Sequence, residues 1–220
     1  MSLKMIKSIV AKIENTCVYD IAIRTPLEKA SNLSHRLGNN IFIKRDDLQP
    51  VFSFKLRGAY VKIKNLLDSK SIKSIIAASA GNHAQGVAMS SLKLGVKAII
   101  VMPKTTPLIK VNAVKSLKAQ VILHGDSYDD AYAFALQKSK KDKLDFIHPY
   151  DDEDVISGQG TMAMEILQQV DNKPDYIFVP VGGGGLLAGI VAYFSIHSPK
   201  TKIVTVEPED SDCYNKAFTN

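Results

Sequence analysis

The sequence predicts an α/β protein with an open, largely parallel sheet. From about residue 72 onward, apolar runs of strand length alternate with segments of helix length. Most of these runs are rich in Val and Ile and lack a strict alternation of apolar and polar residues, which is typical of strands that are covered on both faces. Strands and helices that alternate in this way indicate a parallel sheet flanked by helices.

The individual elements follow in order along the chain. A helix is expected at the start, because Met5, Ile9 and Ile13 recur on one helical face. The segment 41–48 is predicted to be a strand that ends in charged residues, and a helix follows near Lys55. In the regular part, strands are predicted at 75–79, 96–102, 119–124, 176–181 and 202–207. Helices are predicted between them at 82–94, 107–117, 127–141, 154–170 and 185–197.

The composition is that of a globular chain and excludes several classes of protein. Its 220 residues suffice for one large or two small domains, and no apolar run reaches membrane-spanning length. Cys17 and Cys213 form no metal-type pair, and no signal peptide is recognised, so a cytoplasmic protein is expected. The net charge of +6 comes from scattered lysines with one run at 138–143, which indicates a solvated helix end and not a nucleic-acid surface.

The strongest local signal is a run of four glycines between a predicted strand and a predicted helix, Gly182, Gly183, Gly184 and Gly185. Their backbone N–H groups can close around an anion, and the helix that continues from Leu186 adds its dipole. A tight turn would need only one or two glycines, so the run favours phosphate binding. It is not a P-loop, because no Gly-Lys-Ser/Thr follows. Glu207 lies about 22 residues further on, at a strand end, so a nucleotide stays possible on spacing.

A second polar loop lies at another predicted junction between a strand and a helix. The small residues Ser79, Ala80 and Gly81 let a ligand approach the backbone, and Asn82 and His83 offer side-chain hydrogen bonds near a helix start. This pattern suits a carboxylate or another anion. The alternative is an N-cap by Ser79 or Asn82 with a solvated His83, and for His83 both interpretations stay open.

Lys55 has an unusual setting, because it stands among Phe52, Phe54 and a leucine. A lysine amine condenses with an aldehyde when it is neutral and desolvated. A phosphorylated aldehyde cofactor would also need a phosphate loop, and pyridoxal 5′-phosphate is such a cofactor, an electron sink for amino-acid carbanions. A further small-residue stretch, 157–161, favours close packing more than a turn beside a ligand.

These residues resemble those of the threonine dehydratases, most of all the biosynthetic form, within the pyridoxal-phosphate enzymes of the tryptophan synthase β-like fold. The resemblance runs from about residue 18 to the end of the sequence. The matching segments are 24-RTPL-27, 44-KRDDLQPV-51, 53-SFKLRGAY-60, 79-SAGNHAQGVA-88, 94-LGVKAIIVMP-103, 157-SGQGT-161 and 179-VPVGGGGL-186.

The resemblance implies a role for each matching site residue. Lys55 corresponds to the lysine that binds the cofactor covalently and later removes the substrate α-proton. Asn82 corresponds to the asparagine that hydrogen-bonds the cofactor ring hydroxyl. The loop 182–186 would bind the cofactor phosphate, and the loop 79–83 would receive the substrate carboxylate. Phe54 and Arg57 are expected to support the lysine without taking part in the chemistry.

The resemblance also implies an architecture of two open, largely parallel sheets. A small domain, residues 46–150, would be inserted into a large cofactor-binding domain formed by residues 1–45 and 151–220, with the cofactor between them. No helix stop follows the segment 211–220. The chain is therefore expected to be a fragment that lacks the C-terminal part of the large domain and has little activity of its own.

The implied reaction is a β-elimination that converts L-threonine to 2-oxobutanoate and ammonia, the first step of isoleucine biosynthesis, with L-serine giving pyruvate. The implied partners are a small amino-acid substrate and further copies of the chain. A serine racemase, a serine dehydratase or another β-eliminating or β-replacing enzyme remains an alternative, as does a nucleotide-binding module, which would have no use for Lys55. Similar serine racemases carry an acid/base serine where this chain has Ala80, which favours elimination.

A divalent-cation site near the end of the chain is a weak hypothesis. Glu207, Ser211 and Asp212 carry oxygen atoms at a place where serine racemases bind a metal. Three such side chains are also common at the end of a strand, so no metal is expected.

Overall fold

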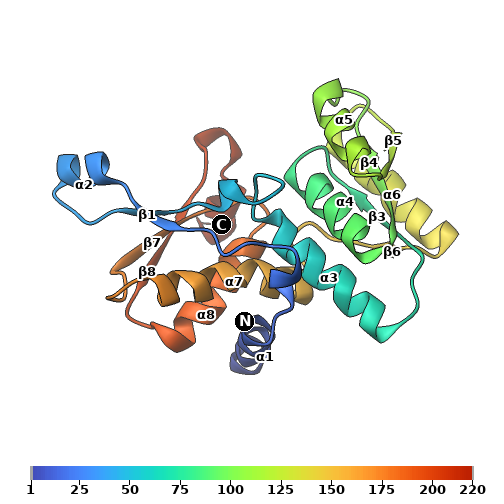
Figure 1. Ribbon diagram of the computed structural model, residues 1–220. Helices are drawn as coiled ribbons and strands as arrows, with labels where there is room; N and C mark the ends of the chain where they lie inside the picture. The colour runs from blue at the N-terminus through green and yellow to red at the C-terminus, as the bar shows by residue number, and fades with distance from the viewer. Residues whose placement is uncertain (1, 220) are drawn as a thin grey trace.

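The computed structural model describes residues 2–219 and confirms the α/β class (Figure 1). The helices are α1 (Leu3–Glu14), α2 (Ser31–Leu37), α3 (Lys55–Ser69), α4 (Asn82–Leu94), α5 (Leu108–Ser116), α6 (Tyr128–Asp142), α7 (Glu153–Gln169), α8 (Gly185–His197) and α9 (Cys213–Thr219). The strands are β1 (Leu27–Lys29), β2 (Phe42–Lys44), β3 (Ser74–Ala78), β4 (Lys97–Met102), β5 (Gln120–Leu123), β6 (Asp145–Phe146), β7 (Tyr176–Pro180) and β8 (Lys202–Val206). Short 3-10 turns lie at Val18–Asp20, Asp46–Leu48 and Glu209–Ser211. No helix within residues 2–219 has the length and apolar character needed to cross a membrane.

The strands form three separate sheets among the described residues, and two of these sheets are parallel as predicted. One sheet has four parallel strands in the order β5-β4-β3-β6, and a second consists of the parallel pair β7-β8. β1 and β2 form an antiparallel pair on an arm that also carries α2 (Figure 1). The predicted strand at 41–48 is wrong in its second half, because the chain turns at Asp46–Leu48 and buries the carboxylate of Asp46.

Helices cover both faces of the four-stranded sheet. Along β3, Ile75 and Ala77 belong to a core shared with α3, α4 and α5, while Ile76 and Ala78 meet α6 on the opposite face. Successive side chains of a strand point to opposite faces, so an unbroken apolar strand serves two cores. This is the physical reason for the Val- and Ile-rich runs in the sequence.

A further core joins α1, α7 and α8 beneath β7 and β8. Its members include Ile9 and Ile13 of α1, which confirms the predicted apolar face of that helix. Most members of each of these hydrophobic clusters lie on one side of the predicted domain boundaries at residues 46 and 150. The division into two domains stays a prediction. α3 contacts both α4 and α7, so this helix lies where the two groups of helices meet (Figure 1). Lys55 is its first residue.

Paired glycines let α3, α7 and α8 pack closely. A Cβ on Gly158 would lie 2.6 Å from the Cα of Gly58, and a Cβ on Gly189 would lie 2.7 Å from the Cα of Gly160. The stretch 157–161 is therefore a packing motif, as the sequence favoured. These crossings hold the start of α3 and the start of α8 on one rigid frame.

Candidate active site

Lys55 is the first residue of α3, and its amine lies in partly apolar surroundings. Its Nζ donates a hydrogen bond to the carbonyl oxygen of Pro149 at 2.7 Å and lies 5.5 Å from the ring centroid of Phe54. Burial lowers the pKa of Lys55 from 10.5 to about 8, and no carboxylate in the described chain offsets that effect. Phe54 packs against the core of α1, α7 and α8, whereas Phe52 is 77% exposed and does not shield the amine.

The loop 79–83 joins β3 to α4 and leaves polar groups free. The hydroxyl of Ser79 accepts a hydrogen bond from the backbone N–H of Gly81 at 3.2 Å. A Cβ on Gly81 would meet no atom within 4 Å, so the space above the loop is open. Asn82 is exposed, and its amide has no hydrogen-bond partner in the part of the chain that the structure describes. The alternative in which Ser79 or Asn82 caps α4 is wrong, since the N-cap is Gly81.

His83 turns away from this open space. Its ring is 3% exposed, and Nε2 lies 3.0 Å from the carbonyl oxygen of Ile147. A carbonyl only accepts, so Nε2 carries the proton and Nδ1 is left as a buried acceptor without a partner among residues 2–219. Burial lowers the pKa of His83 to about 3, which keeps the ring neutral. The interpretation of His83 as a solvated side chain is therefore wrong.

The loop 79–83 and Lys55 are brought together by the packing of α4 on α3. A Cβ on Gly86, one turn into α4, would lie 3.0 Å from the backbone of Lys55. Only a glycine permits this approach without displacing the start of α3. The predicted carboxylate loop and the predicted cofactor lysine therefore lie beside each other.

The four glycines at 182–185 differ in why the fold does or does not require a glycine at each position. Gly184 has a φ of +83°, a conformation that side chains with a Cβ rarely adopt. A Cβ on Gly183 would lie 2.1 Å from the ring of Tyr150, and one on Gly185 would lie 2.7 Å from its backbone. Gly182 alone has open space around it. Three of the four glycines are thus explained by conformation or packing, without a ligand.

The same loop nevertheless offers a run of free donors. The first backbone hydrogen bond of α8 is donated by Ala188 to Gly184, and no acceptor within residues 2–219 meets the N–H groups of residues 182–187. Such orphan donors at a helix N-terminus, with the positive end of the helix dipole, form a cradle for an anion. This donor set fits a phosphate group, so the loop meets the requirement that a phosphorylated cofactor imposes.

The sequence did not predict a role for the segment 147–151, which contacts Lys55, His83 and the glycine loop. Pro149 accepts from Lys55, Ile147 accepts from His83, and Tyr150 covers the glycine loop. The segment follows the two-residue strand β6, which is too short to predict. The signal available in the sequence was the crowding of His, Pro and Tyr side chains just before α7.

Arg57 fixes the first turn of α3 through buried ion pairs. Its guanidinium is completely buried and donates to both oxygens of Asp46, at 2.7 and 2.9 Å. It also donates to both oxygens of Glu165 and, at 3.0 Å, to the hydroxyl of Thr161 on α7. The expected support of the lysine is therefore an ion-pair network that joins α3 to α7.

The candidate metal ligands near the end of the chain are otherwise engaged. Both oxygens of Glu207 accept backbone N–H groups at the start of α9, at 3.0 and 2.9 Å. Asp212 pairs with Lys216 at 2.7 Å. No group of three or more His, Cys, Asp or Glu side chains suited to a metal ion occurs among the described residues.

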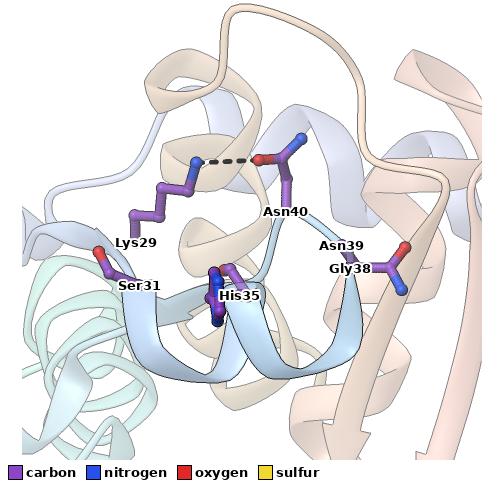
Figure 2. Close-up of a pocket in the computed structure, with 7 residues that line it drawn as sticks. Lys29, Ser31, His35, Gly38, Asn39 and Asn40 are labelled. Atoms are coloured by element: carbon purple, nitrogen blue, oxygen red, sulfur yellow. Dashed lines mark hydrogen bonds between the residues drawn. The ribbon is translucent and has the colours of Figure 1, made fainter.

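A hollow of about 420 Å³ lies elsewhere, on the arm formed by β1, α2 and β2 (Figure 2). Lys29 and Asn40 face each other across it, with a hydrogen bond of 2.9 Å. None of the predicted site residues lines this hollow. The candidate active site is the region between Lys55, the loop 79–83 and the glycine loop.

A desolvated lysine beside an anion cradle is the arrangement that a pyridoxal phosphate site requires. The model of the pyridoxal-phosphate dependent enzyme family matches residues 18–220, and the chain belongs to that family. Within it, the chain is similar to biosynthetic threonine dehydratases, which confirms the resemblance seen in the sequence.

Three relatives illustrate that similarity. The chain is 56% identical over 198 residues to the chloroplastic biosynthetic threonine dehydratase of Arabidopsis thaliana, covering 90% of this chain and 33% of the relative. It is 54% identical over 201 residues to the biosynthetic L-threonine dehydratase of Haemophilus influenzae, covering 91% and 39%. The processed form of threonine deaminase isoform 2 from Solanum lycopersicum superposes with a TM-score of 0.91 at 49% identity, covering 94% and 57%. The chain thus spans well under half the length of the curated relatives it matches.

Proposed function

We propose that this chain forms a pyridoxal 5′-phosphate site and supports threonine ammonia-lyase activity, giving 2-oxobutanoate and ammonia from L-threonine. One observation carries the proposal. The acceptor-free N–H groups of residues 182–187 lie beside Tyr150, and the adjacent carbonyl of Pro149 holds the Lys55 amine at 2.7 Å. A cradle for phosphate and a desolvated amine are the two features that a phosphorylated aldehyde needs.

Each loop has a distinct role in the proposal. The N–H groups of residues 182–187 bind the cofactor phosphate, and the amide of Asn82 meets the ring hydroxyl. The open loop 79–83 receives the substrate carboxylate through its backbone donors. Bound pyridoxal phosphate supplies the electron sink that stabilises negative charge at the substrate α-carbon.

Lys55 holds and moves the proton. Its low pKa, about 8, leaves an appreciable fraction of the amine neutral near neutral pH. A neutral amine beside the α-carbon accepts the α-proton, and the carbonyl of Pro149 then accepts a hydrogen bond from the resulting ammonium. In the whole reaction, the α-proton and the β-hydroxyl leave as one water, and hydrolysis of the enamine that remains consumes one water and releases ammonia together with the keto acid.

Ala80 favours elimination over racemisation. Its methyl group has no proton to give from the face opposite Lys55, so inversion at the α-carbon lacks an acid there. The proposal therefore includes pyruvate, and not D-serine, as the product from L-serine. The proposal also includes a cytoplasmic location and assembly of the chain into homo-oligomers.

The activity is tested with purified chain, added pyridoxal phosphate and L-threonine, followed by measurement of 2-oxobutanoate. The expected result is slow turnover, well below that of a full-length dehydratase, that disappears in Lys55→Ala while the circular dichroism of the folded chain is retained. Formation of D-serine from L-serine at a rate similar to that of pyruvate would reject the assignment as an ammonia-lyase. Absence of 2-oxobutanoate together with absence of cofactor binding would reject the whole proposal.

A further inference from the structure

The segment 147–151 is held rigidly at both ends. Ile147 is fully buried, and its N–H donates to the carbonyl of Ile76 at 2.8 Å, which extends the edge of the four-stranded sheet. At the other end, the carboxylate of Asp152 accepts from the N–H of Asp154 at 2.9 Å and caps α7. The five residues therefore span between two fixed elements with little freedom to move.

The conformation of the residues within the segment 147–151 is fixed as well. His148 Nδ1 accepts hydrogen bonds from the backbone N–H groups of Tyr150 and Asp151, at 3.3 and 2.8 Å. Burial lowers the pKa of His148, which keeps Nδ1 available as an acceptor. The His148 ring meets the Tyr150 ring edge to face at a centroid distance of 4.6 Å. Tyr150 is consequently presented in one orientation.

Tyr150 rests directly on the glycine loop. Its ring occupies the space that a Cβ on Gly183 would need, and its backbone occupies the space that a Cβ on Gly185 would need. The loop and the aromatic ring therefore fit each other only because both positions are glycine. The ring atoms Cγ, Cδ1 and Cε1 lie at this contact, and the Tyr150 hydroxyl has no hydrogen-bond partner in the described part of the chain.

We propose that Tyr150 is a positioning residue that holds the glycine loop in the shape in which its N–H groups bind a phosphate. The inference rests on the proposed function and assigns a role to a residue outside the sequence segments that match the family. The ring acts as a rigid support: it fills the space beside Gly183, so the loop cannot move into that space. Removal of the ring lets the loop relax, and the preorganisation for phosphate is lost.

The phosphate group itself separates this role from general packing. Pyridoxal has the same aldehyde and ring as pyridoxal phosphate but lacks the phosphate. A residue that positions the phosphate loop affects binding of pyridoxal phosphate and leaves binding of pyridoxal almost unchanged. A residue that only stabilises the fold affects both compounds alike.

The experiment is equilibrium dialysis of the two compounds against the unmodified chain, Tyr150→Ala, Tyr150→Phe and, as a control on an exposed aromatic residue, Tyr176→Ala. Tyr150→Ala is expected to weaken binding of pyridoxal phosphate about tenfold, the equivalent of one lost hydrogen bond to a charged group. Tyr150→Phe and Tyr176→Ala are expected to bind both compounds as the unmodified chain does. Tyr150→Leu, which keeps most of the volume, replaces the alanine variant if that variant does not fold.

The outcomes separate the two proposals. Unchanged binding of pyridoxal phosphate in Tyr150→Ala, or an equal loss for both compounds, overturns the role of Tyr150. Failure of the unmodified chain to bind pyridoxal phosphate more tightly than pyridoxal overturns the phosphate site itself, and with it the proposed function.

Discussion

Lys55 carries an amine that the fold desolvates without providing an opposite charge. A partner such as the Asp152 carboxylate beside Lys62, at 2.6 Å, favours the charged form and raises the pKa of Lys62. Lys55 has only the Pro149 carbonyl and the edge of an apolar core, so desolvation decides its pKa. Lys62 is thus held in an ion pair, whereas Lys55 has the lowered pKa that the proposed cofactor chemistry requires.

The lowered pKa of Lys55 predicts a pH dependence of cofactor binding. The native amine titrates at about 8 and the unfolded amine at 10.5, so the native chain binds fewer protons between these values. Stability contributed by this group therefore rises with pH across that window. The neutral amine is the form that condenses with an aldehyde, so affinity for pyridoxal phosphate is expected to increase as pH rises through about 8. Spectrophotometric titration in a pH series checks this, and a midpoint near 10.5 would contradict it.

The buried network around Arg57 predicts a large loss of stability on removal of one partner. Glu165 is completely buried and accepts hydrogen bonds from Arg57, Lys44 and Tyr19. Glu165→Leu leaves these donors unpaired and is expected to lower the free energy of unfolding by about 3–5 kcal/mol. The exposed pair Lys64–Asp68 provides the control, because solvent screens this pair and Asp68→Asn is expected to change the free energy of unfolding far less. Urea denaturation of both variants measures the two values, and similar small losses would refute the structural role.

At the scale of elements, the glycines in the turn from β7 into α8 serve two purposes, which are packing or backbone conformation on one side and the proposed phosphate binding on the other. Gly183, Gly184 and Gly185 are required by packing or by φ, whereas Gly182 faces open space. A substitution at Gly184 strains the backbone whether or not a ligand binds there. Gly182 is the position at which a side chain disturbs a bound phosphate and little else.

This distinction predicts different results for two matched variants. Gly182→Val is expected to retain the stability of the unmodified chain but to weaken binding of pyridoxal phosphate at least tenfold, because its side chain enters the phosphate cradle. Gly184→Ala is expected to lose about 1 kcal/mol of stability from its positive φ. Thermal melts and dialysis are measured on both. A Gly182→Val chain that binds the cofactor normally would show that the loop does not hold the phosphate.

The sequence predicted those elements that have a strong pattern, and it failed where the pattern is short. The helices at 82–94 and 185–197 were predicted at their observed bounds, because each begins after a glycine-containing turn and follows an apolar strand. β1 and β6 have three and two residues, too few for a period to show. In the candidate site, the lysine and the loop residues could be proposed from residue type, and their roles stay predictions. The proposed role of Tyr150 could not be predicted in this way, because it depends on a contact with Gly183, which lies 33 positions further along the chain.

At the scale of the whole molecule, one face of the β7-β8 pair is open. Tyr176 and Phe178 lie on that face, 52% and 67% exposed, and Val206 beside them is 48% exposed. α7 and α8 pack under the other face, in the core that includes Val179. Parallel strands are usually covered on both faces, so this surface is unusually apolar for a single chain in water.

The open face predicts self-association of the chain at high concentration. Phe178→Ser is expected to lower binding of the dye anilinonaphthalene sulfonate and to shift the chain toward monomer, since it removes the most exposed aromatic group of the pair. Tyr128→Ser, at an exposed aromatic residue on α6, is the matched control. Sedimentation velocity and dye fluorescence check the prediction, and it fails if Phe178→Ser and the unmodified chain behave alike.

The most direct test of the central claim is chemical labelling of the cofactor lysine. The chain is incubated with pyridoxal phosphate near neutral pH, reduced with borohydride, digested and mapped by mass spectrometry. The label is expected on the peptide that contains Lys55, at close to one per chain, and it is expected to fall sharply in Gly182→Val. Label distributed over surface lysines, or concentrated on a lysine other than Lys55, would contradict the assignment of the site.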